Sequence, residues 1–89
     1  MEDLLELNNV NIIDIRDKFK YNNSHIPGAI NIPSNYLIIN PSDYLNKNET
    51  YYLYCDSGVI SNRVSNELNS MGFNTINVVG GYNYYLLIK

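Results

Sequence analysis

The sequence contains a single cysteine, Cys55, in surroundings that could make it reactive. It follows a short run of strand-forming residues, 51–54, and precedes the segment Asp56-Ser57-Gly58-Val59-Ile60-Ser61, which leads into a helical pattern. The carboxyl ends of parallel strands are where ligands bind, and a helix N-terminus there offers free N–H groups and a partial positive charge. Such surroundings lower the pKa of a thiol and favour the nucleophilic thiolate. We therefore predict a nucleophilic Cys55 that needs no histidine base.

The loop after Cys55 has the composition of an anion-binding turn. Ser57 and Gly58 are small and flexible, so the backbone amides of residues 56–61 can converge on one point and hold an anion or an anionic sulfur. We expect the thiol to face this loop cavity. The alternative is that Cys55 is a small, inert core residue, as many free cysteines are.

The elements that would position this loop can be read from the hydrophobic pattern. Between the apolar runs 51–54 and 75–79, apolar residues recur at helical spacing, forming a stripe of Ile60, Val64, Leu68 and Met71. Gly72 follows as a helix cap, so the pattern predicts a helix over residues 59–71. The expected strands are residues 10–15, 29–32, 51–54 and 75–79, and the weaker helices are 1–7, 17–21, 34–39 and 82–87. A strand, helix and strand within about 30 residues join parallel strands, so the predicted fold class is α/β.

Composition excludes several classes of function. The 89 residues, with a net charge of −3, predict one domain over residues 1–89, and the six basic residues form no stripe for nucleic acid. No apolar run reaches the roughly 20 residues of a membrane helix, and the first residues are acidic, so we expect no membrane association and a cytoplasmic location. One cysteine and one histidine exclude a disulfide and the usual zinc sites, and we expect no metal and no cofactor.

Several motifs together resemble the rhodanese-like domains. The first block is Asp14-Ile15-Arg16 followed by residues 24–33, Ser-His-Ile-Pro-Gly-Ala-Ile-Asn-Ile-Pro, and the second is the loop from Cys55 through Gly58 to Ser61. Residues 71–73 through the double glycine at 80–81 resemble the closing strand of the family. The resemblance covers about residues 10–85. It implies a mostly parallel five-stranded sheet with helices on both faces.

The resemblance also implies a reaction. In the rhodanese-type sulfurtransferases the loop cysteine takes sulfane sulfur from a donor such as thiosulfate or a persulfide, and passes it to a thiol or to cyanide. Cys55 would be the nucleophile, and the amides of residues 56–61 (Asp56, Ser57, Gly58, Val59, Ile60 and Ser61) would hold the terminal sulfur. Some members place a basic residue where Lys20 stands here, which makes Lys20 a candidate for binding the donor; the alternative is a solvated surface lysine.

Two other functions stay open. The loop side chains include Asp56 and no cation, so a protein-borne persulfide is a competing donor, and the domain would then relay sulfur between proteins with poor activity on thiosulfate. A rhodanese-fold module that binds proteins without catalysis is the second alternative. Phosphatases of the same fold need an arginine six positions after the cysteine, where Ser61 stands, and we expect Arg63 to lie on the surface.

The remaining polar and aromatic residues have structural interpretations. We expect His25 to fix its turn by hydrogen bonds, and Asp14 and Arg16 to form an ion pair at a strand end. The aromatic and aliphatic side chains near the end of the sequence either cap the core or leave an apolar patch for a partner or a second copy; they are Tyr82, Tyr84, Tyr85, Leu86, Leu87 and Ile88.

Overall fold

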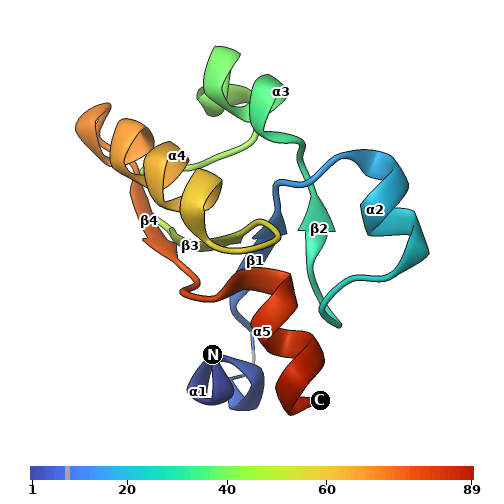
Figure 1. Ribbon diagram of the computed structural model, residues 1–89. Helices are drawn as coiled ribbons and strands as arrows, with labels where there is room; N and C mark the ends of the chain where they lie inside the picture. Colours follow the sequence, from blue (N-terminus) through green and yellow to red (C-terminus); the bar gives the residue numbers. More distant parts are fainter. Residues whose placement is uncertain (8) are drawn as a thin grey trace.

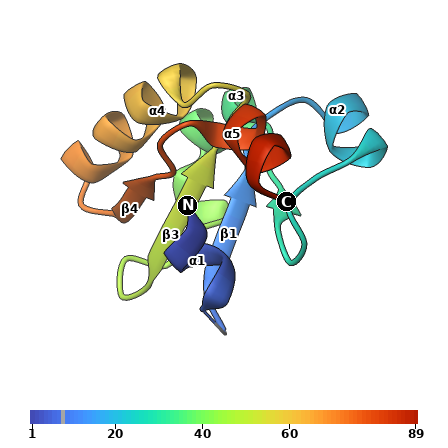
Figure 2. The same ribbon diagram turned by 60° about the horizontal axis from the view of Figure 1, so that its bottom comes forward.

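A computed structural model describes residues 1–7 and 9–89. In this part of the chain four strands form one parallel sheet in the order β2-β1-β3-β4: β1 (Asn11–Asp14), β2 (Ile30–Asn31), β3 (Thr50–Tyr54) and β4 (Asn74–Asn77). Figure 2 shows β1 and β3 side by side and pointing the same way. The helices are α1 (Glu2–Glu6), α2 (Lys18–Asn23), α3 (Ser34–Ile39), α4 (Val59–Ser70) and α5 (Gly81–Ile88), with a 3₁₀ turn, η1 (Pro41–Asp43).

The sheet of the described residues has four strands, not the five that the family resemblance implied. The difference agrees with the apolar pattern, which indicated four. α1 lies within the helix predicted over residues 1–7, with Leu4 packed into the core and Glu2 and Asp3 in the first turn, where the helix dipole favours acids.

Helices cover both faces of the sheet, as expected (Figure 1). Strand side chains alternate between the faces, and this sends Leu53 and Cys55 to the face covered by α3 and α4. Asp14 and Tyr54 point to the opposite face, where Tyr82 of α5 lies. The active-site candidate and the Asp14–Arg16 motif are therefore on different sides of the same strand ends.

The boundary predictions hold best for the helices. α4 begins at residue 59 as predicted and ends one residue early, and α3 has the predicted range. α2 is shifted slightly, because the Asp17 side chain caps it by accepting a hydrogen bond from the Lys20 amide at 2.8 Å. η1 was not predicted.

The buried face of α4 differs from the predicted stripe. Val64 and Leu68 are buried as expected, but Ile60 and Met71 are exposed. Ser61 and Ser65 are buried in their place. Their hydroxyls have partners there, since Ser61 contacts Cys55 and Ser65 bonds to Thr75 at 2.6 Å, so polar residues tolerate this interface.

β4 ends at Asn77, two residues before the predicted end. The Val78 amide still donates to the Leu53 carbonyl at 2.8 Å, but the chain then turns through Gly80 and Gly81, both with positive φ, into α5. The apolar side chains of α5 do not all cap the core: Tyr82 is buried, but Leu86 and Leu87 are exposed. No helix of the described residues is long and apolar enough to cross a membrane.

Candidate active site

Cys55 is the first residue after β3, and its side chain continues the alternation of that strand toward α4. Its sulfur accepts hydrogen bonds from the backbone N–H of Gly58 at 3.2 Å and of Ser61 at 3.3 Å. The thiol also lies 3.3 Å from the Ser61 hydroxyl. Peptide hydrogens from the loop and from the first turn of α4 therefore converge on the sulfur.

The thiol is more enclosed than the sequence led us to expect. Cys55 is only 6% exposed and packs in the core beneath α3 and α4, because the strand face that it continues is covered by α4. Burial by itself raises the pKa of the Cys55 thiol. Hydrogen bonding with the Ser61 hydroxyl and with the backbone of Ser61, Gly58 and Ser57 outweighs it, so the pKa of Cys55 lies below its ordinary value.

The backbone of the loop is held by α5. The first-turn amides of Tyr82 and Asn83 donate to the carbonyls of Cys55 and Asp56, both at 2.9 Å. With the carbonyls turned to α5, the loop N–H groups are free to face the sulfur. α5 approaches so closely that a Cβ on Gly81 would lie 2.5 Å from the Cys55 carbonyl oxygen.

Gly58 is required by the loop conformation. Its φ is +97°, a region that favours glycine, and a Cβ there would lie 3.2 Å from the Gly80 nitrogen. Gly58 is also the N-cap of α4, so the positive φ bends the chain from β3 into the helix whose first turn carries Ser61. The glycine thus brings both donors to the sulfur.

Of the other predicted loop residues, Ser57 contributes its backbone to the hydrogen bonding of the sulfur, while Asp56, Val59 and Ile60 do not. The Val59 amide lies 3.5 Å from the Ser57 hydroxyl and makes no bond to sulfur, and the Val59 and Ile60 side chains are exposed. The Asp56 side chain pairs with two cations, Lys20 and Arg16. The binding roles predicted for these residues stay predictions.

Lys20 lies beside the loop and is bound to Asp56. Its ammonium is 2.7 Å from Asp56 Oδ2, and the Arg16 guanidinium is 3.8 Å from Asp56 Oδ1. The contact with Asp56 raises the pKa of Lys20. Because Arg16 also pairs with Asp14, these two cations are balanced by two carboxylates, and no positive charge is left over between them.

Arg16 forms the predicted ion pair with Asp14, and the pair is buried. The guanidinium donates to the carboxylate at 2.7 Å and to the Ser24 carbonyl at 2.6 Å. It also lies over the ring of Tyr82, 4.1 Å from the ring centroid. The pair therefore ties β1 to α5 and to the loop.

His25 has the structural position expected of it. Its Nδ1 lies 2.8 Å from the Tyr21 carbonyl, and its ring stacks on that of Tyr21 with centroids 3.7 Å apart. Arg63 is exposed on α4, as predicted. No group of three metal-ligating side chains occurs within residues 1–7 and 9–89.

Sequence reasoning missed Asn77, which contacts the site through Ser61. The Ser61 hydroxyl donates to Asn77 Oδ1 at 2.5 Å. Asn77 lies at the end of β4, paired with Leu53 of β3. Only the register of the two strands reveals that it is near Cys55, and no local motif marks it.

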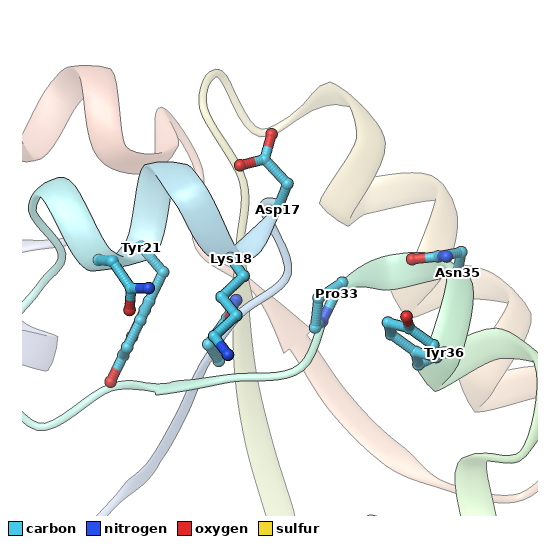
Figure 3. A pocket seen from close by; sticks show the side chains of 8 residues that line it. Asp17, Lys18, Tyr21, Pro33, Asn35 and Tyr36 are labelled. Carbon is cyan, nitrogen blue, oxygen red and sulfur yellow. The ribbon is translucent and has the colours of Figure 1, made fainter.

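Two hollows flank the strand ends. A groove of about 670 Å³ lies between α2 and the start of α3 and is lined by Tyr21, Asn31, Tyr36 and neighbouring residues (Figure 3). A second hollow, of about 420 Å³, lies over the loop and is lined by Ser57, Gly58, Val59, Asn62, Asn77, Val79 and Gly80. Cys55 lines neither hollow, and what distinguishes its position is the set of hydrogen bonds to its sulfur.

The chain matches the rhodanese-like domain family over residues 1–87. It belongs to this family. The crystal structure of SSP1007 from Staphylococcus saprophyticus is 40% identical, with a TM-score of 0.83 over 94% of this chain and 83% of that one. A rhodanese-like domain protein from Staphylococcus aureus is 36% identical, with a TM-score of 0.79 over 92% and 79% of the two chains.

Curated relatives of this rhodanese-like domain have sulfur-related names. The putative sulfur carrier protein YrkF of Bacillus subtilis is 36% identical over 73 residues, which are 81% of this chain and 39% of that protein. The thiosulfate sulfurtransferase PspE of Escherichia coli is 33% identical over 70 residues, or 78% and 67% of the two chains. A tRNA sulfurtransferase of Thermoplasma acidophilum is 39% identical over 61 residues, which span 68% of this chain and only 12% of that protein. This domain thus spans well under half the length of two of these three relatives.

Proposed function

We propose that this domain is a sulfurtransferase that carries sulfane sulfur as a persulfide on Cys55. The observation that carries the proposal is the pair of main-chain N–H groups, from Gly58 and Ser61, that donate to the sulfur at the N-terminus of α4. Hydrogen bonds to an anionic sulfur stabilise both the attacking thiolate and the persulfide that it becomes. The sulfur carrier and sulfurtransferase relatives support the same chemistry.

The reaction is a double displacement at sulfur. The Cys55 thiolate attacks the sulfane sulfur of the donor; an S–S bond forms to Cys55, the donor's S–S bond breaks, and sulfite leaves from thiosulfate or a thiolate leaves from a persulfide. An acceptor thiolate or cyanide then attacks the outer sulfur and restores the Cys55 thiolate. Each step forms one bond to the transferred sulfur, breaks one S–S bond and moves no proton, which suits a site without a general base.

The charges of the site favour a persulfide donor over thiosulfate. Lys20 is the predicted candidate for binding a dianion, but Asp56 pairs with its ammonium at 2.7 Å, and Arg16 is paired with Asp14. A dianion entering here meets a site with no excess positive charge, so the attraction that steers anions into a cleft is weak. We therefore propose a persulfide, free or on a protein, as the preferred donor, with thiosulfate as a poor one.

A relay between proteins is the second candidate function. Val59 and Val79 line the hollow over the loop and are 73% and 78% exposed. Apolar side chains at the rim of a reactive site suit contact with another protein. In this second candidate function, the domain would act in the cytoplasm and exchange sulfur with a protein partner.

Sulfur loading tests the proposal directly. The protein is incubated with glutathione persulfide or with thiosulfate, and intact mass spectrometry measures its gain of sulfur. We expect one added sulfur atom with the persulfide, slower addition with thiosulfate, and discharge by cyanide or dithiothreitol. Cys55→Ala should gain none while remaining folded. A wild-type protein that gains no sulfur from either donor would show a binding module instead of a transferase.

A further inference from the structure

The hydroxyl of Ser61 lies between two acceptors. Its oxygen is 3.3 Å from the Cys55 sulfur and 2.5 Å from Asn77 Oδ1. Ser61 is fully buried, so this hydroxyl has no alternative bond to water. It carries one hydrogen, which it can donate to only one of the two acceptors at a time.

In the arrangement of the structure, that hydrogen is donated to Asn77. The Cys55 thiol then donates its own hydrogen to the Ser61 oxygen, and all three groups are satisfied. When Cys55 becomes a thiolate, it no longer donates and needs donors instead. The Ser61 hydroxyl can donate its hydrogen bond to the sulfur only if it no longer donates to Asn77.

We propose that Asn77 is a positioning residue that controls, through the Ser61 hydroxyl, how strongly the anionic Cys55 sulfur is held. The inference rests on the proposed function, and it adds a residue on another strand to the site. It assigns Asn77 no contact with the donor or the acceptor.

A carboxamide suits this role because its two ends are nearly the same size and have opposite hydrogen-bonding character. With Oδ1 toward Ser61, Asn77 accepts the hydroxyl hydrogen and supports the neutral thiol. With the amide rotated, Nδ2 donates to the Ser61 oxygen, and the hydroxyl turns to the sulfur. A carboxylate has no donor, so Asp at position 77 would hold the hydroxyl hydrogen permanently away from the sulfur.

The backbone holds Asn77 in place for this exchange. It ends β4, with Leu53 of β3 as its register partner, and the neighbouring Val78 amide donates to the Leu53 carbonyl at 2.8 Å. Its Nδ2 lies 3.9 Å from the Cβ that Gly58 lacks, which places the amide against the loop. The side chain is half-buried and lines the hollow over the loop, so there is room for the amide to rotate.

The charged groups near Cys55 do not replace this control. In the loop, Asp56 is paired with Lys20 and Arg16. From β1, Asp14 pairs with Arg16 on the other face of the sheet. α4 carries Arg63 and Glu67 on its exposed side, while α3, α5, β3 and β4 carry no charged residue. None of these charged side chains is hydrogen-bonded to the sulfur, so the Ser61 hydroxyl is the side-chain group that bonds to it, beside the main-chain N–H groups of Gly58 and Ser61.

The test is the pKa of Cys55, measured as the pH dependence of its alkylation by iodoacetamide. Asn77→Asp should raise the Cys55 pKa by about one to two units, since one hydrogen bond to a charged group is lost. Asn77→Ala should lower the pKa or leave it unchanged, because the hydroxyl is then free to serve the sulfur. The opposite directions distinguish hydrogen-bond control from a general disturbance of the fold.

Two controls separate the hydroxyl from the added charge. Asn62→Asp places a carboxylate in the same hollow, one residue from Ser61, and reports the effect of charge alone. In a Ser61→Ala background, Asn77→Asp should shift the pKa no more than Asn62→Asp does. Circular dichroism and thermal melting verify that each variant is folded.

An Asn77→Asp shift that is equal with and without the Ser61 hydroxyl would overturn the inference, as would a raised pKa in Asn77→Ala. These outcomes are independent of sulfur loading. If wild-type protein gains no sulfur but the pKa cycle behaves as described, the proposed function fails while the role of Asn77 in thiol ionisation stands. If sulfur loads and the cycle shows no coupling, only the role of Asn77 fails.

Discussion

Replacing Asp14 with asparagine should destabilise the protein strongly. Asp14 is fully buried and binds the Arg16 guanidinium at 2.7 Å and the Tyr54 hydroxyl at 2.7 Å. The amide keeps the volume of the carboxylate, so no cavity forms, but it removes the charge that balances Arg16, whose side chain is only 5% exposed. Asp56, 3.8 Å away and largely engaged with Lys20, cannot replace it.

The magnitude follows from the cost of leaving a buried charge unpaired, about 3 to 5 kcal/mol. The total stability of a small domain is only about 5 to 15 kcal/mol, and each kcal/mol shifts the melting temperature by about 4 to 8 °C at this length. We therefore expect the melting temperature of Asp14→Asn to fall by at least about 12 °C.

Urea unfolding followed by far-ultraviolet circular dichroism measures the change, since the chain contains no tryptophan. Asp43→Asn is the matched control: it removes one acid from an exposed turn, and it should change stability by less than about 0.5 kcal/mol. A loss below about 1 kcal/mol in Asp14→Asn, with an unchanged dependence on urea, would refute the view that this pair holds the strand end.

Three further perturbations probe the loop. Gly81→Ala should destabilise the protein by more than about 2 kcal/mol, because the new Cβ would meet the Cys55 carbonyl at 2.5 Å. Gly28→Ala is the control, since Gly28 also has a positive φ but has no atom within 4 Å of the added Cβ, and it should cost about 1 kcal/mol. Equal losses in thermal melts would contradict the close approach of α5. Asp56→Asn should accelerate sulfur loading from thiosulfate, because it removes a negative charge and releases Lys20, and the gain should shrink in high salt; an unchanged rate would show that charge does not limit the donor. Because folding lowers the pKa of Cys55, the unfolded chain binds the thiol proton more tightly than the folded one. The stability of wild type relative to Cys55→Ala should therefore increase as the pH rises from the lowered pKa of the folded state toward the pKa of the unfolded state. A stability difference that stays flat or falls with pH in urea titrations would contradict the lowered pKa.

Local patterns predicted the parts of this protein that local physics determines. The helical spacing of Val64 and Leu68 with Gly72 behind it located α4, and the family blocks located the Asp14–Arg16 pair and the loop. The apolar runs predicted four strands, which the described residues have, while the resemblance predicted five.

Features that depend on contacts between distant segments could not be predicted in this way. The burial of Cys55 depends on how closely α4 covers the end of β3, and the neutralisation of Lys20 by Asp56 joins residues 36 positions apart. Asn77 is near the sulfur only because β4 pairs with β3 in one particular register. The buried Ser61 and Ser65 broke the apolar stripe of α4 because their hydroxyls find partners across the interface.

The hydrogen bonds from α5 to the carbonyls of Cys55 and Asp56 bear on the order in which the surroundings of the thiol form during synthesis. β3, the loop and α4 all precede α5 in the chain, so during synthesis they leave the ribosome earlier. Until α5 docks, the carbonyls of Cys55 and Asp56 lack the hydrogen bonds that the amides of Tyr82 and Asn83 give them. We therefore expect the lowered pKa of Cys55 to depend on the docking of the last helix, and the thiol of a nascent chain arrested before α5 should react with alkylating agents like an ordinary cysteine.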